Sequence, residues 1–193
     1  MFTWLFLTTK LKQNTLNLMI DTLQDKYLLL EEKRKKLYEL LETLDEKQLN
    51  FRPAEDKWSI TQIVFHLVKA EQLSVISINK EIRNTENRKA GISALVRSSL
   101  LKYALMSPLK FKAPAIMGNI PKEYDINELK TKWITVRKKL HTALGDVDTE
   151  LGKRYLFTHP YAGKMNIYQT MDFLVQHFNH HNRQIKALAD RGT

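Results

Sequence analysis

The sequence predicts an all-α protein built as a bundle of four long helices. Apolar residues recur at spacings of three and four in four separate segments, and no alternating run is long enough to indicate a sheet. A long basic stretch broken by prolines separates the second segment from the third, which predicts a long connection between those helices. With 193 residues, the chain is expected to form a single domain over 1–193.

The first helix is predicted from Thr22 to Glu46, before Pro53 interrupts the pattern. Residues 1–20 are expected to be an N-terminal extension. Their apolar start is too short to span a bilayer and lacks the basic flank of a signal peptide. We therefore expect no membrane span and a cytoplasmic location. One predicted stripe of this helix comprises Leu30, Lys33, Leu37, Leu40, Leu41 and Leu44.

Capping-box patterns mark the starts of the second and fourth helices. Ser59 is followed three positions later by Gln62, and Asn166 by Gln169, so side chains at each start can satisfy free backbone N–H groups. Asp125 or Asn127 can cap the third helix. The predicted spans are 59–83, 125–145 and 166–190.

A basic segment, residues 88–122, connects the second and third helices. It contains seven lysine and arginine residues and no acidic residue, within a chain of net charge +10. A short accessory helix is predicted over Ile92–Met106. This charge would favour an anionic small molecule, an acidic lipid surface or a nucleic-acid backbone, or it is simply a solvated surface. Few aromatic residues accompany it and no recognition motif does, so no nucleic-acid partner is expected.

Three histidines are predicted to face the interior of the bundle. His66 lies on the apolar face of the second helix, and His177 and His181 lie one turn apart on the fourth. Three imidazoles can bind one divalent metal and leave a position open for water, as in catalytic sites. Alternatively, each is a core histidine satisfied by hydrogen bonds. The chain has no cysteine, so any metal must bind through nitrogen and oxygen.

The remaining histidines receive other expectations. His180 lies about 80° from the His177–His181 face, which suggests a supporting or surface position. His159 lies in a predicted loop that can approach the open metal position, and it is the candidate catalytic residue. No glutamate follows His177 in the manner of an H-E-x-x-H protease, so peptide hydrolysis by that route is excluded.

Two motifs resemble the DinB-like (DinB/YfiT) superfamily. The stretch from Trp58 to Leu67 is similar to its W-S-x-x-x-x-x-x-H-L signature, and 159–163 is similar to the turn before its last helix. That last helix is matched by His177, His181, Arg183, Gln184 and Ile185. The resemblance implies a four-helix bundle of the DinB/YfiT type, with His66, His177 and His181 as ligands of nickel, zinc or a similar divalent transition metal.

The resemblance also implies a function. The leading expectation is a metal-dependent enzyme acting on a small-molecule substrate, either a thiol S-transferase that uses a low-molecular-weight thiol or a hydrolase. The alternative is a stress-related, non-enzymatic scaffold bundle in which the metal is structural or incidental. Bundles of this second kind are often dimeric, which leaves a homodimer open.

Overall fold

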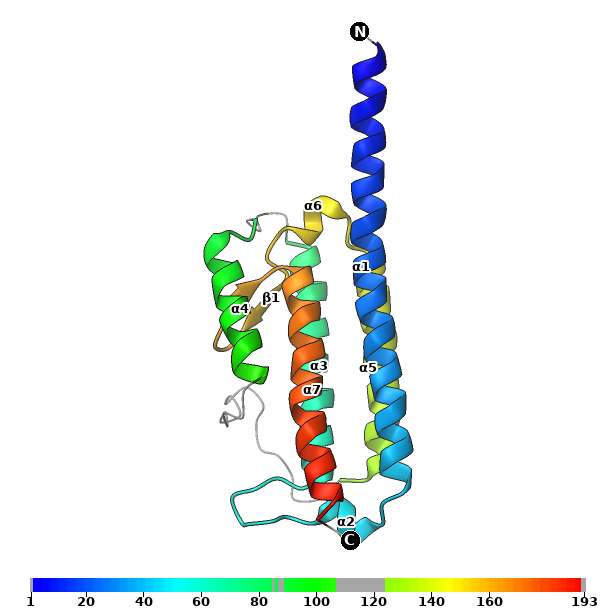
Figure 1. Cartoon of the computed structure of the whole chain (residues 1–193), viewed down its shortest axis with the longest axis vertical. Coiled ribbons are helices and arrows are strands. Elements are labelled where there is room, and N and C mark those ends of the chain that lie inside the picture. Colours follow the sequence, from blue (N-terminus) through cyan, green and yellow to red (C-terminus); the bar gives the residue numbers. More distant parts are fainter. Residues whose placement is uncertain (1, 85, 87–88, 107–123, 192–193) are drawn as a thin grey trace.

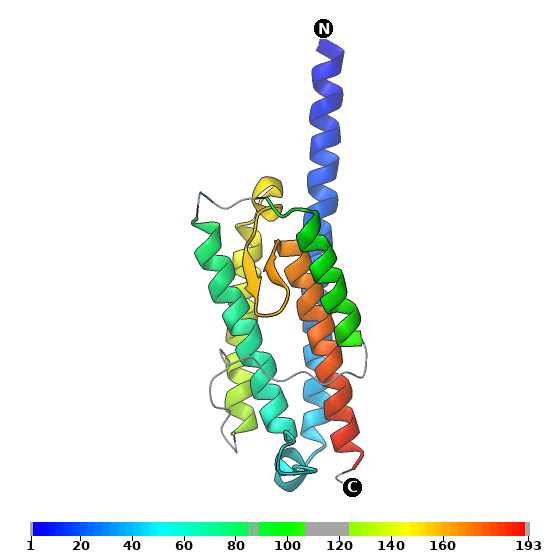
Figure 2. The ribbon, with the colours of Figure 1, turned by 90° about the vertical axis from the view of Figure 1, so that its left-hand side faces the viewer.

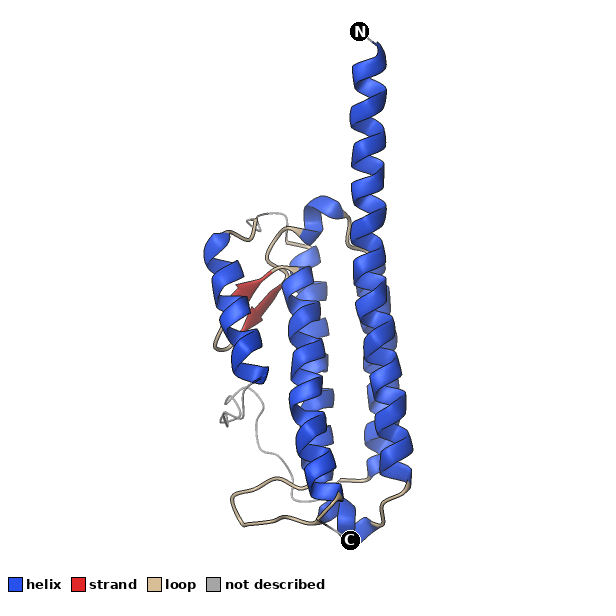
Figure 3. Cartoon of the chain, viewed as in Figure 1, coloured by secondary structure: helices blue, strands red, loops and turns tan. Residues whose placement is uncertain are grey.

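A computed structural model describes residues 2–84, 86, 89–106 and 124–191 of the chain. Four long helices form the bundle (Figures 1 and 3): α1 (Phe2–Glu42), α3 (Ile60–Ile82), α5 (Ile126–Gly145) and α7 (Ile167–Ala189). The smaller elements are α2 (Glu46–Asn50), α4 (Ile92–Met106), α6 (Thr149–Gly152), β1 (Phe157–His159) and β2 (Gly163–Met165). The predicted all-α bundle is confirmed, including the accessory helix α4.

Capping explains where the two central helices begin. Ser59 caps α3 and Asn166 caps α7. In each case the cap side chain accepts the backbone N–H of the glutamine three residues later, and the side-chain oxygen of that glutamine accepts the backbone N–H of the cap. Both capping boxes were predicted from the sequence. A third, between Asp45 and Gln48, begins α2.

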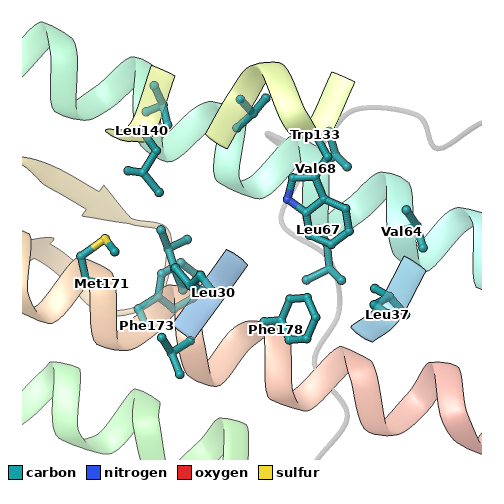
Figure 4. Close-up of a cluster of buried hydrophobic side chains, with 14 of the residues drawn as sticks. Leu30, Leu37, Val64, Leu67, Val68, Trp133, Leu140, Met171, Phe173 and Phe178 are labelled. Carbon is teal, nitrogen blue, oxygen red and sulfur yellow. The ribbon is translucent and has the colours of Figure 1, made fainter. Parts of the chain in front are cut away.

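The core lies where the four long helices meet. Figure 4 shows Leu30 and Leu37 from α1, Trp133 from α5 and Phe178 from α7 directed toward one another, and all four are buried. In this arrangement α3 packs against α5 and α7, and α1 packs against the same two helices. α3 and α7 run in opposite directions (Figures 1 and 2), so the middle of α3 lies beside the middle of α7.

The structure differs from the sequence-based expectations in two places. α1 begins at Phe2 instead of Thr22, and its N-terminal part extends beyond the other helices (Figure 1). A short antiparallel hairpin, β1–β2, precedes α7, and Gly163, the first residue of β2, has φ of +70°. Strands of three residues are too short to produce a detectable alternation. Figure 2 shows the hairpin and α4 on one side of the bundle; 107–123, part of the predicted basic segment, lies outside the described residues.

Candidate metal centre

The antiparallel packing of α3 and α7 brings His66, His177 and His181 together. One ring nitrogen from each lies within 4.8 Å of the others. The Nε2 atoms of His66 and His177 are 3.0 Å apart. His177 and His181 share a face of α7 because they are four residues apart.

The chemistry of this donor set fits a divalent transition metal. Two nitrogens bound tetrahedrally at about 2.0–2.1 Å are roughly 3.3 Å apart, close to the separation of the His66 and His177 nitrogens. All three rings are buried, and within the described part of the chain no Asp or Glu joins the cluster. A three-nitrogen cluster of this kind can hold a metal and still leave coordination positions for other ligands.

Burial keeps the three imidazoles neutral, as metal binding requires. Desolvation, with a smaller contribution from His180, lowers the pKa of His66 to about 4. Burial and the neighbouring histidines hold the pKa values of His177 and His181 well below 6.5. Near neutral pH each ring therefore has a free lone pair, and no proton must be displaced before an ion binds.

A chain of hydrogen bonds orients His181. Its Nδ1 lies 2.8 Å from Oε1 of Gln184, whose Nε2 lies 3.1 Å from Nε2 of His180. Nδ1 of His180 in turn lies 3.0 Å from the carbonyl oxygen of Leu105 in α4. Because an amide oxygen only accepts, His181 must donate from Nδ1, which leaves its Nε2 lone pair free for a metal.

The other rings around the cluster are held by packing. Trp58 lies 5.0 Å from His66 and 6.4 Å from His181, measured between ring centroids. Among the described residues, Nδ1 of His66 has no hydrogen-bond partner although it is buried, so the contacts with Trp58 and His177 orient this ring. His180, expected in a supporting or surface position, is buried and belongs to the series of hydrogen bonds that orients His181. The family resemblance included Gln184 in the last helix, but the sequence gave no sign of its role.

A cavity of about 920 Å³ opens beside the three histidines. Its walls are mainly apolar, and they come from α3, α4, the hairpin and α7. The apolar lining includes Trp58, Leu73, Leu101, Leu105, Phe157 and Phe173. This volume is sufficient for a small molecule, and the neutral imidazoles lie in its wall.

His159 lies at the end of β1 and lines the same cavity. Its Nδ1 accepts the backbone N–H groups of Tyr161 and Ala162 at 3.2 and 3.1 Å. The neutral ring therefore carries its proton on Nε2. Phe173 lies between His159 and His177, with ring centroids 4.6 Å from the first and 5.1 Å from the second.

The burial of His159 predicts a specific dependence of stability on pH. Desolvation lowers its pKa to about 4, whereas an unfolded histidine titrates near 6.5. Between these values only the unfolded chain binds the proton, so acid favours unfolding. In metal-free protein we expect His159 to lower the free energy of unfolding by up to about 3 kcal/mol as pH falls from 6.5 to 4. Urea unfolding across this range measures the loss.

The variant His159→Gln is the matched comparison, because glutamine retains an acceptor for the two backbone N–H groups but does not titrate. Its stability should decline less steeply with acid than that of the wild type. The metal-site histidines titrate in both proteins, so their contribution cancels. If the free energies of unfolding of the two proteins fall equally as pH falls, the buried His159 is not the source of the acid sensitivity.

Fold and site together define a helical-bundle protein with a candidate divalent-metal centre made of three histidines. Residues 29–185 match the family model of the DinB superfamily. The chain therefore belongs to the DinB superfamily.

Individual relatives agree with this assignment. The uncharacterized protein YuaE of Bacillus subtilis (strain 168) is 22% identical over 160 residues, which cover 83% of this chain and 94% of YuaE. The solved structure of YfiT from Bacillus subtilis, described as a probable metal-dependent hydrolase with an unusual four-helix bundle topology, superposes with a TM-score of 0.61. It is 21% identical, and the match covers 88% of this chain and 86% of YfiT. This likeness supports the fold.

Proposed function

We propose that the protein is a divalent-metal-dependent enzyme acting on a small molecule. In this proposal His66, His177 and His181 are the metal ligands, and nickel and zinc are the leading candidates for the ion. The observation that carries it is the position of three buried, neutral imidazoles in the wall of a large cavity. A purely structural metal site would use a closed set of protein ligands and would need no such space.

The reaction class follows from the residues at the cavity. A bound ion of this kind lowers the pKa of water or a thiol, so that a nucleophile exists at neutral pH without a carboxylate base. Within the described residues, the histidine cluster contains no carboxylate. This supports either a hydrolase-like reaction, for which the description of YfiT is a precedent, or transfer of a low-molecular-weight thiol.

We assign to His159 the role of a hydrogen-bond donor at the cavity wall. Its Nδ1 is occupied by two backbone N–H groups, so Nε2–H is the polar group that the ring can present to a substrate. A neutral imidazole with this tautomer can donate a hydrogen bond to negative charge that develops on a substrate or leaving-group oxygen. The cavity wall beside it includes the apolar side chains of Phe157 and Phe173.

The test is an activity screen with defined metal content. Chelator-stripped protein, reloaded with zinc or nickel, is assayed on ester and amide substrates and on low-molecular-weight thiols with an electrophilic acceptor. We expect activity only in the reloaded protein, loss of activity in His66→Ala, and a reduction of about 10²-fold or more in His159→Gln. Lys186→Ala, on the exposed side of α7, is the matched control. Full activity of the stripped protein, or of His66→Ala, would refute the proposal and favour the scaffold alternative.

A further inference from the structure

Helix α4 has two apolar faces. The inner face packs against α7, and Leu101 and Leu105 on it line the cavity of the candidate metal centre. The opposite face is in contact with solvent. It carries five large apolar side chains that are each 52–69% exposed, namely Leu95, Val96, Leu100, Tyr103 and Met106.

These five side chains lie on one side of the helix, with Ser99 among them, and we call this side the outer face of α4. At 100° per residue they occupy an arc of about 140°. The outer face continues toward the hairpin, because Arg97 donates from Nε to the carbonyl oxygen of Ala162 at 2.9 Å. The adjacent Tyr161 is 60% exposed. Isolated exposed apolar residues are common, but a contiguous set of this size marks an interaction surface.

Cations border the outer face on α4, and this helix contains no acidic residue. On the helix, Lys102 lies about 20° from one edge of the arc and Arg97 about 60° beyond the other. Both are exposed. In the sequence this helix belongs to the basic segment 88–122, which has seven basic residues and no acidic one. The partner must therefore offer an apolar layer next to negative charge.

A second copy of the chain does not meet this requirement. In a two-fold dimer the same patch faces itself, so Arg97 and Lys102 would approach their own equivalents. α4 provides no acidic side chain to pair with them, and like charges across an interface oppose association. An anionic bilayer offers acyl chains for the apolar arc and phosphates for the two cations.

We propose that the outer face of α4 docks the protein onto an anionic lipid surface. The helix lies in the plane of the bilayer interface. Leu95, Leu100 and Tyr103 lie below the headgroups, and Lys102 lies at the level of the headgroups. None of the described helices is long and apolar enough to cross a membrane, and this docking requires no crossing. Because the inner face of α4 lines the cavity, docking would place that cavity about one helix diameter, roughly 10 Å, from the headgroups.

Vesicle flotation with full-length protein tests this proposal. We expect binding to phosphatidylcholine vesicles that contain phosphatidylglycerol, weak binding to pure phosphatidylcholine, and release at high salt. Leu95→Ser/Leu100→Ser should lower the partition coefficient by about tenfold or more. The matched control, Leu28→Ser/Ile134→Ser, changes two exposed apolar residues on α1 and α5 and should bind as the wild type does.

A charge reversal separates local docking from general attraction to a basic protein. Lys102→Glu should weaken binding several-fold, whereas Lys138→Glu, on the exposed side of α5, should not. The proposal is overturned if anionic vesicles do not retain the protein, or if the α4 and control variants lose binding equally. It is also overturned if sedimentation shows a dimer that Leu95→Ser/Leu100→Ser dissociates, because the outer face then belongs to a second copy. None of these measurements depends on the metal centre.

Discussion

The variant His177→Ala/His181→Ala is expected to lose tight binding of zinc and nickel. The wild type should bind about one ion, and at a hundredfold excess over the dissociation constant this stabilises the fold by about 2.7 kcal/mol. For a chain of this length that corresponds to a rise in melting temperature of roughly 5–10 °C. The double variant should show no such rise, because a single imidazole remains in the cluster. Metal analysis and thermal unfolding of stripped and reloaded protein measure both effects.

Two further variants make this test specific. His141→Ala removes an exposed histidine that packs against Tyr27, outside the cluster, and should leave metal binding unchanged. Gln184→Ala removes the acceptor that orients His181, and should weaken metal affinity about 10–100-fold without abolishing it. Retention of one tightly bound ion by the double variant would show that the cluster is not the binding site.

Much of the site was accessible from the sequence because its geometry follows from helix periodicity. The spacing of His177 and His181 places them on one face whatever surrounds them, and the apolar neighbours of His66 direct it inward. Two capping boxes correctly predicted where α3 and α7 begin. The sequence did not show the relative position of α3 and α7 along their axes, and this position decides whether the three imidazole rings come together.

Other features depend on contacts between residues far apart in the chain. The predicted stripe of α1 contained Lys33, but the buried basic residue is Arg34, which pairs with Glu31 at 2.7 Å. The buried residues Leu23, Leu30, Arg34, Leu37 and Leu41 share one side of α1 within an arc of about 60°, and Lys33 lies outside this arc, so the predicted stripe was rotated away from the buried side. Similarly, nothing local distinguishes Glu71 from a surface glutamate, yet it is 2% exposed. Its burial depends on a partner 66 residues away.

That partner is Arg137, and breaking the pair should have the largest effect on stability of any single substitution discussed. Arg137 donates from Nε and Nη2 to the two carboxylate oxygens of Glu71 at 2.6 and 2.7 Å, and it is 1% exposed. Trp133 donates to the same carboxylate at 2.8 Å. Arg137 also contacts Glu31 through Nη1 at 3.3 Å, so the network joins α1, α3 and α5.

Arg137→Met is therefore expected to lower the free energy of unfolding by about 3–5 kcal/mol, because it leaves the Glu71 charge buried with only one strong donor. Glu71→Gln should also destabilise the fold. The double variant Glu71→Gln/Arg137→Met should recover most of the loss, because the charge is gone and the glutamine oxygen still accepts from Trp133. Urea unfolding of the wild type, the two single variants and the double variant gives the interaction energy of the pair as a double-mutant cycle.

The exposed pair Lys36–Glu32 gives the control, since both side chains are more than half exposed and Lys36→Ala should leave the free energy of unfolding nearly unchanged. If Arg137→Met fails to fold, the double variant still shows whether the unpaired Glu71 charge is the cause. A double variant that folds again can owe this only to removal of that charge. A single-variant loss close to that of the surface control would mean that the buried pair contributes little. A double variant less stable than either single variant would mean that the pair itself, and not the isolated charge, holds the three helices together.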